Sequence, residues 1–205
     1  MTFNCNNIIY IFFLVVLFAC NSESDIQEKY YLNGQLKSKL THINGVAQGR
    51  GVTYYENGNI ESIANYYNGV GLGTPVSYYE NGFPKLIQTI DSMGKLNGSA
   101  VVYYKNGIIK EYGTYTNNMR NGLWIFYFEN GQYSLIVEYT MGKPNGNVLV
   151  FHDNGVLAIE KKFKNDKKIG TWTYYDQYGE GVKIEKYEND RMISSQILKE
   201  SYTKE

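Results

Sequence analysis

The feature that most constrains this chain is a pair of glycine series that recur with a common period. The first series is spaced by 24 residues, with a single interval of 25: Gly34, Gly58, Gly82, Gly107, Gly131, Gly155 and Gly179. The second keeps step with it: Gly49, Gly73, Gly98, Gly122, Gly146 and Gly170. Two series in register over this length indicate seven repeat units, from about Gln27 to Met192.

Further positions repeat when the residue after each second-series glycine is numbered 1, so that Arg50 to Gly73 is one unit. Position 5 is aromatic in all units: Tyr30, Tyr54, Tyr78, Tyr103, Tyr127, Phe151 and Tyr175. Position 8 is Asn in the first six: Asn33, Asn57, Asn81, Asn106, Asn130 and Asn154. Position 17 carries a ring except in the third unit: His42, Tyr66, Tyr115, Tyr139, Phe163 and Tyr187.

Each unit reads as a β-hairpin. Positions 2 to 7 are rich in β-branched and aromatic residues, Asn-Gly makes a turn, and positions 10 to 18 form the return strand. No stretch after Cys20 keeps a helical period over three turns. The sequence predicts an all-β fold, an elongated antiparallel array of seven hairpins and fourteen strands.

The turn type decides which side chains share a face. A two-residue Asn-Gly loop would separate positions 5 and 17, whereas a three-residue Glu-Asn-Gly loop pairs position 5 with 11. We favour the three-residue loop and expect positions 3, 5, 11 and 17 on one face. In the third unit, which has the extra residue and Pro84, we expect a bulged or displaced second strand.

The N-terminus has the pattern of a targeting segment. Residues Ile8 to Ala19 are uniformly apolar, which is too short for a membrane span of about 20 residues but typical of a signal peptide. The alternative is a buried apolar strand or a short anchor. All 20 basic and all 20 acidic residues follow Cys20, so this part of the chain has no net charge.

The stretch Leu17-Phe18-Ala19-Cys20 resembles the lipobox of bacterial lipoproteins. The resemblance implies a signal peptide over residues 1–19 and diacylglycerol on the thiol of Cys20. It also implies attachment to the envelope, on the periplasmic or surface face of the outer membrane. Residues 20–26 would then be a polar tether, 27–192 the repeats, and 193–205 a C-terminal edge or tail.

The pattern of aromatic, Asn-Gly turn, aromatic and Asn-Gly-x-x-x-Gly resembles the MORN-repeat variant over nearly all the chain after the tether. Bacterial chains of this kind are grouped with the YwqK family of predicted antitoxins. The resemblance implies a scaffold or protein-binding array and, as an alternative, neutralisation of a toxin. Glucan-binding wall repeats are similar, but their unit is nearer 20 residues and richer in Trp, so glycan binding is a second alternative.

We find no constellation for catalysis, and expect no enzyme, cofactor or metal. The two histidines, His42 and His152, fall in different units, and no catalytic or zinc-ligand motif is present. Interleaved charges give no basic stripe for nucleic acid.

The candidate binding surface is the row at position 6, expected to be exposed: Tyr31, Tyr55, Tyr79, Tyr104 and Phe128. Rings in register could grip a partner protein or stack on a glycan.

Overall fold

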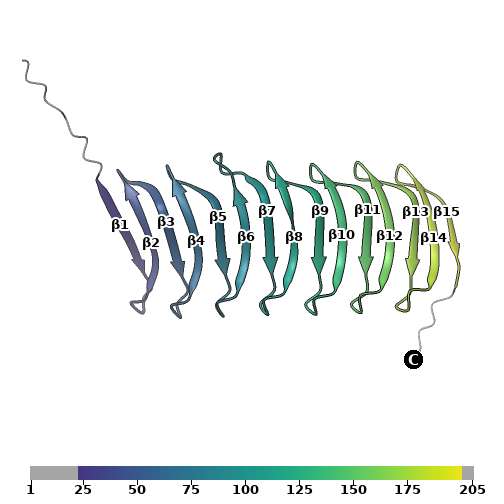
Figure 1. Cartoon of the computed structure of the whole chain (residues 1–205), viewed down its shortest axis with the longest axis horizontal. Coiled ribbons are helices and arrows are strands. Elements are labelled where there is room, and N and C mark those ends of the chain that lie inside the picture. The colour runs from purple at the N-terminus through teal and green to yellow at the C-terminus, as the bar shows by residue number, and fades with distance from the viewer. Residues whose placement is uncertain (1–22, 200–205) are drawn as a thin grey trace, which may run out of the picture.

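The computed structural model describes residues 23–199, which form one open antiparallel sheet of fifteen strands in chain order. Figure 1 shows the strands side by side in a single row, with β1 and β15 at opposite ends of the row. No helix occurs within these residues. The predicted all-β hairpin array is therefore confirmed.

The strands alternate with short loops along the whole array. Their bounds are β1 Ser24–Tyr30, β2 Leu36–Ile43, β3 Val46–Tyr54, β4 Ile60–Tyr67, β5 Val70–Tyr78, β6 Pro84–Ile90, β7 Leu96–Tyr103, β8 Ile109–Thr116, β9 Met119–Tyr127, β10 Tyr133–Thr140, β11 Lys143–Phe151, β12 Leu157–Lys164, β13 Lys167–Tyr175, β14 Gly181–Glu188 and β15 Arg191–Ile197. Fourteen strands were expected. The fifteenth, β15, pairs with β14 and covers the edge of the last hairpin.

The hairpin tips have the predicted three-residue loop. In the second unit, the Gly58 amide donates to the Tyr55 carbonyl at 2.9 Å, and the Tyr55 amide donates to the Asn59 carbonyl at 2.8 Å. Gly58 has φ +85°, a conformation that side-chain-bearing residues rarely adopt. This explains the first glycine series.

A β-bulge follows every tip. Tyr54 pairs with Ile60, but Thr53 pairs with Ser62, so Glu61 at position 12 has no partner in the ladder. The same shift occurs in all seven hairpins. One extra residue on the return strand moves all later side chains to the opposite face, because the strand period is two.

The prediction that position 17 shares a face with positions 3, 5 and 11 is therefore wrong. Gly49 pairs with Tyr66, which puts position 17 on the face of positions 2, 4, 13 and 15. We call this the core face, and the face of positions 3, 5, 11 and 14 the outer face. The predicted three-residue loop was correct, but the bulge beyond it was not foreseen.

The loops at the other end are mostly two-residue turns with positive φ at both residues, such as Asn68 (φ 49°) and Gly69 (φ 80°). This geometry suits the twist of paired strands. The third unit differs, since its extra residue lies in a longer loop, in which the Gly94 amide donates to Asp91. Ile90 pairs with Gly73, as Tyr66 at position 17 pairs with Gly49 in the second unit. The strand β6 is therefore not displaced.

The core lies on the core face in the C-terminal part of the array. Trp124 is 1% exposed, and Ala100, Val137 and Val148 are buried with it. The indole packs edge-on against Tyr115, with ring centroids 5.0 Å apart, and its Nε1 donates to the Thr114 carbonyl at 3.0 Å. Other rings and aliphatic side chains pack around this cluster: Phe126, Leu135, Tyr139, Val150 and Phe163.

Gly113 and Arg120 enclose the Trp124 ring. A Cβ atom on Gly113 would lie 2.3 Å from the indole, so only glycine lets the ring lie against β8. The Arg120 guanidinium lies 4.1 Å from the ring centroid and pairs with Glu111 at 2.9 Å. A cation over an indole adds about 0.5–2 kcal/mol, depending on desolvation.

Candidate interaction surfaces

The position-6 row lies at the hairpin tips, and all five of its side chains are half-buried, so the expectation that the row is exposed is wrong. The four tyrosines donate their hydroxyls to the position-5 carbonyl of the next unit at 2.7–2.8 Å: Tyr31 to Tyr54, Tyr55 to Tyr78, Tyr79 to Tyr103 and Tyr104 to Tyr127. Phe128 has no hydroxyl to donate. The row therefore joins neighbouring hairpins, and its role in binding a partner stays a prediction.

In three units the bulge residue at position 12 is a lysine whose side chain lies over the position-6 ring. The ammonium groups of Lys37, Lys85 and Lys110 lie 5.2–5.8 Å from the centroids of the Tyr31, Tyr79 and Tyr104 rings. Desolvation raises the pKa of the Tyr55 and Tyr104 hydroxyls, which keeps them protonated as donors. Sequence reasoning missed this contact, because the bulge that turns position 12 toward the ring was not foreseen.

The asparagines at position 8 also join adjacent units. The Asn57 side chain accepts a hydrogen bond from the Asn59 amide at 2.9 Å, which stabilises its own turn. The side-chain NH2 group of Asn57 also donates to the backbone carbonyl of Glu80 at 3.4 Å. The equivalent hydrogen bond in the fifth unit, from Asn130 to the carbonyl of Asp153, is shorter, at 2.7 Å. The repeated Asn is therefore a contact between tips as well as a turn former.

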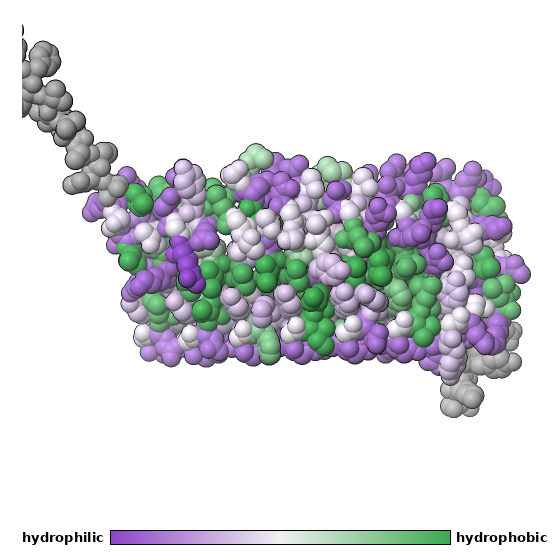
Figure 2. Space-filling view, viewed as in Figure 1, coloured by the Kyte–Doolittle hydropathy of each residue, from purple (hydrophilic) through white to green (hydrophobic). Residues whose placement is uncertain are grey.

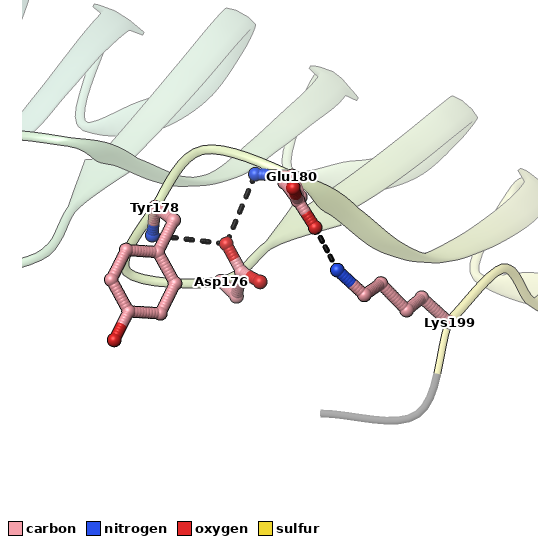
Figure 3. A network of polar contacts seen from close by, with 4 residues as sticks. All are labelled: Asp176, Tyr178, Glu180 and Lys199. Carbon is pink, nitrogen blue, oxygen red and sulfur yellow. Dashed lines mark hydrogen bonds and ion pairs between the residues drawn. The ribbon is translucent and has the colours of Figure 1, made fainter. Parts of the chain in front are cut away.

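The seventh hairpin tip has different residue types at positions 6 and 8, the two positions that contact the following hairpin in other units (Figure 3). Asp176 replaces the position-6 ring and accepts from the amides of Tyr178 and Glu180 at 2.9 and 3.0 Å. Tyr178 replaces the Asn at position 8 and is 73% exposed. Lys199, beyond β15, pairs with Glu180. Asp176 and Tyr178 therefore lack the side chains that join other tips to the hairpin after them.

An aromatic row crosses the outer face over β8 to β11, and we call it the outer-face row. Its members are Tyr112, Tyr127, Tyr133 and Phe151. Tyr112 stacks on Tyr127 at 6.3 Å between centroids, and the next two pairs are tilted at 5.2 and 5.8 Å. Tyr112 is 37% and Tyr133 44% exposed. Figure 2 shows apolar residues in a band along the middle of the array, between polar margins.

His152 and the acidic residues form no chemical site within the described residues. His152 lies at position 6, and its Nε2 is 3.1 Å from the Tyr175 carbonyl, where the tyrosine hydroxyls bond in other units. Within residues 23–199, no cluster of His, Cys, Asp or Glu could hold a metal ion, and no helix could cross a membrane. Cys20 and the apolar segment lie outside the described residues.

This geometry defines a class of protein, the open β-hairpin repeat arrays, in which each unit contacts only its neighbours. The family model of the MORN repeat variant matches residues 26–44, 47–68, 96–117, 120–140 and 144–165, and the chain belongs to this family. The unmatched units are the third, with its longer loop, and the seventh, with its altered tip. A search of curated proteins finds no match.

MORN repeat arrays are generally interaction modules for proteins or membranes, and such all-β arrays are typically non-enzymatic. The family thus supports the coarse expectation of an interaction module. It leaves open what this chain binds.

Proposed function

We propose that this protein is a non-enzymatic, lipid-anchored envelope protein whose array binds another protein. The observation that carries the proposal is the outer-face row, in which Tyr112 and Tyr133 remain over one-third exposed within a contiguous set of rings. Aromatic side chains are enriched at protein interfaces, because they bury a large area with few rotatable bonds.

The rigidity of the array supports this role. The ladder between β8 and β9, the position-6 hydroxyls and the asparagine contacts hold neighbouring hairpins in register, so the rings lie on a preformed surface. A preformed surface loses little conformational entropy on binding. The row thus suits a partner that contacts several hairpins at once.

The arrangement of the rings favours a protein over a glycan. Sugars stack on open ring faces, whereas Tyr127 has Tyr112 on one side and Tyr133 on the other at 6.3 and 5.2 Å. Three of the position-6 rings, those of Tyr31, Tyr79 and Tyr104, likewise have a lysine ammonium group over them. The outer-face row offers ring edges and the hydroxyl groups of Tyr112 and Tyr133, which suit side chains and backbone groups of a polypeptide.

The anchor depends on Cys20. Since β1 begins at Ser24, a lipid on Cys20 would hold the array within about 14 Å of the membrane surface, at about 3.5 Å per residue. Globomycin treatment of cells tests this step, because a lipoprotein would accumulate as an uncut precursor. An unchanged chain would contradict the anchor and favour the antitoxin alternative, which requires a cytoplasmic protein.

Crosslinking in intact cells tests partner binding. The double variant Tyr112→Ser, Tyr133→Ser should lose the captured protein, because both exposed rings of the row are removed. Tyr178→Ser is the matched control, since Tyr178 is 73% exposed but lies at the last tip, away from the row. Equal capture by the wild type and the double variant would contradict the proposal, as would capture of purified peptidoglycan in place of a protein.

A further inference from the structure

A cation lies over a tryptophan ring at two equivalent places on the core face. Arg120, at position 22 of the fourth unit, has its guanidinium carbon 4.1 Å from the ring centroid of Trp124. Lys168, at position 22 of the sixth unit, has its ammonium group 5.0 Å from the ring centroid of Trp172. In both cases the tyrosine at position 17 of the following unit is a further ring, 5.8 and 5.1 Å from the cation. The two sites are thus built on the same repeat positions.

The two sites differ in the charge that faces the cation. The Arg120 guanidinium pairs with the carboxylate of Glu111, at position 13 of the same unit, at 2.9 Å. In the sixth unit position 13 is Ile159, so Lys168 has no carboxylate at this position. A cation that is partly removed from water is stabilised by an anionic partner. The first site contains that partner, and the second site does not.

A second cation, Lys161, occupies the position at which the first site has Gly113. The ammonium group of Lys161 lies 5.2 Å from the ring centroid of Trp172. Desolvation and, after it, the positive charge of Lys168 lower the pKa of this ammonium group. Both effects disfavour its charged form, and an anion bound beside the two lysines would offset them.

The carboxylates nearest to this site bond to other groups. Glu185 is 4% exposed and accepts from Lys183 and from two tyrosine hydroxyls. Asp190 accepts from the backbone amide of Lys168 at 2.8 Å. Among the residues that the structure describes, neither Lys161 nor Lys168 forms an ion pair with a carboxylate. Both ammonium groups can therefore pair with an anion that another molecule brings.

We propose that Lys161 and Lys168, over Trp172, form a second binding site, which takes the carboxylate of an Asp or Glu side chain of another protein. The first site is the precedent, because the carboxylate of Glu111 lies there beside the equivalent cation. The second site lies on the core face, opposite the outer-face row, so it goes beyond the proposed function and does not depend on it. Charge-assisted hydrogen bonds are about twice as strong as neutral ones, so the site prefers Glu to Gln.

The test follows the indole N–H signals in the NMR spectrum of the full-length protein in non-ionic detergent. The chain contains two tryptophans, so Trp172 reports on the proposed site and Trp124 is the internal control. The probes are two blocked peptides, Ala-Glu-Ala and Ala-Gln-Ala. We expect Ala-Glu-Ala to shift the Trp172 signal with a dissociation constant of about 10 mM, the scale set by one or two hydrogen bonds to charged groups. Ala-Gln-Ala should cause no saturable shift.

Exchange of position 13 between the two sites makes the test specific. Ile159→Glu supplies the carboxylate that the fourth unit has as Glu111. It should pair with Lys168 and abolish the shift caused by Ala-Glu-Ala. Glu111→Gln should have the opposite effect, because it leaves Arg120 without its carboxylate. In this variant the Trp124 signal should also respond to the peptide.

A third variant tests the cation without adding a charge to the sheet. Lys168→Met keeps an unbranched side chain but removes the ammonium group, and it should weaken binding of Ala-Glu-Ala about tenfold. Lys164→Met is the matched control, because Lys164 is an exposed lysine on the preceding strand and has no ring contact with Trp172 among the described residues. It should leave binding unchanged.

The proposal is overturned if the Glu and Gln peptides shift the Trp172 signal alike, or if Ile159→Glu still binds Ala-Glu-Ala while both indole signals are retained. If Ile159→Glu does not fold, unchanged binding by Lys168→Met has the same meaning. Tighter binding of dimethyl phosphate, a singly charged diester like a phospholipid headgroup, would assign the site to a phosphate group and also overturn the proposal. None of these results alters the crosslinking test, which depends on the outer-face row.

Discussion

The hydroxyl group of Tyr55 donates a 2.7 Å hydrogen bond to the backbone carbonyl of Tyr78, 23 residues further along the chain. The bond joins the tip of one hairpin to the start of the next tip, and the same contact recurs at Tyr31, Tyr79 and Tyr104. Each tyrosine thus adds a side-chain contact to the backbone ladder between units.

Removal of this hydroxyl should weaken the coupling between two units. We expect Tyr55→Phe to lower the free energy of unfolding by about 0.5–1.5 kcal/mol, since the ring remains but one net hydrogen bond is lost. Urea unfolding followed by circular dichroism measures the change. Tyr178→Phe, at the altered seventh tip, serves as the control and should leave the midpoint unchanged.

The reverse change is available in the fifth unit. Phe128→Tyr would place a hydroxyl where the other units donate to the next position-5 carbonyl, here that of Phe151. A gain of about 0.5–1.5 kcal/mol is expected, by the same estimate. A loss of stability in this variant would show that the fifth tip does not have the geometry of its neighbours.

Gly113 should be intolerant of any side chain. Gly113→Ala would press a methyl group against the Trp124 ring, and overpacking of this kind costs about 1–3 kcal/mol. Gly71→Ala is the matched control, because Gly71 also lies in a strand without positive φ and its added Cβ would meet Tyr66 at an ordinary 3.7 Å. Equal unfolding midpoints for the two variants would contradict the packing described for Trp124.

Glu185 should make the last hairpin sensitive to acid. The bonded Lys183 ammonium, at 2.6 Å, and the Tyr174 hydroxyl, also at 2.6 Å, lower the pKa of this buried carboxyl to about 2, from an ordinary 4.5. A lowered pKa stabilises the folded state fully above about pH 4.5, and this contribution is lost as the pH falls toward 2.

Glu185→Gln should therefore be less stable than the wild type at pH 7, and the difference between the two should shrink between pH 4.5 and 2. Thermal unfolding across this range measures it. Glu188→Gln, at an exposed position on the same strand, is the control and should show a smaller effect. A difference that stays constant with pH would show that the charge of Glu185 is not the cause.

Hydrogen exchange should be fastest at the N-terminal end. Among the described residues, the buried hydrophobic side chains begin at Ala100 and continue to Trp172, so the first three hairpins have only partly buried contacts. Local opening follows the local density of packing. Mass spectrometry should find amides of β3 and β4 exchanging before those of β9 and β10, and a uniform rate along the array would contradict this gradient.

The period in the sequence was sufficient to predict the hairpins and their tips. Glycines with positive φ, such as Gly58, are required by the turns, and their spacing reports the hairpin length directly. The face of each side chain could not be predicted in the same way. The bulge at Glu61 has no residue type of its own, since position 12 holds Lys, Glu, Ser, Ala and Val in different units.

The outer-face row was not predicted as a site, because the surface predicted from the sequence was the position-6 row, and only part of its geometry was predicted. Positions 5 and 11 were placed on one face, as Tyr127 and Tyr133 are, because both lie between the tip and the bulge. Tyr112, which stacks on Tyr127 and extends the row, lies beyond a bulge on its return strand, so its face was not predicted. The hydrogen bond from the Tyr55 hydroxyl could not be predicted either. Its acceptor is a backbone carbonyl, which is present in every residue and so is not marked by any residue type.

The odd number of strands has a consequence for association between copies. With fifteen strands in an antiparallel meander, β1 and β15 run in the same direction. A second copy translated along the array would present its first strand parallel to the last strand of the first, unlike any pairing within the sheet. An antiparallel contact between β15 of one copy and β1 of another would require one copy to be turned over, so that its core face continued the other's outer face. The topology therefore opposes head-to-tail growth, whereas two copies that meet β15 to β15, or β1 to β1, would pair antiparallel with their faces matched.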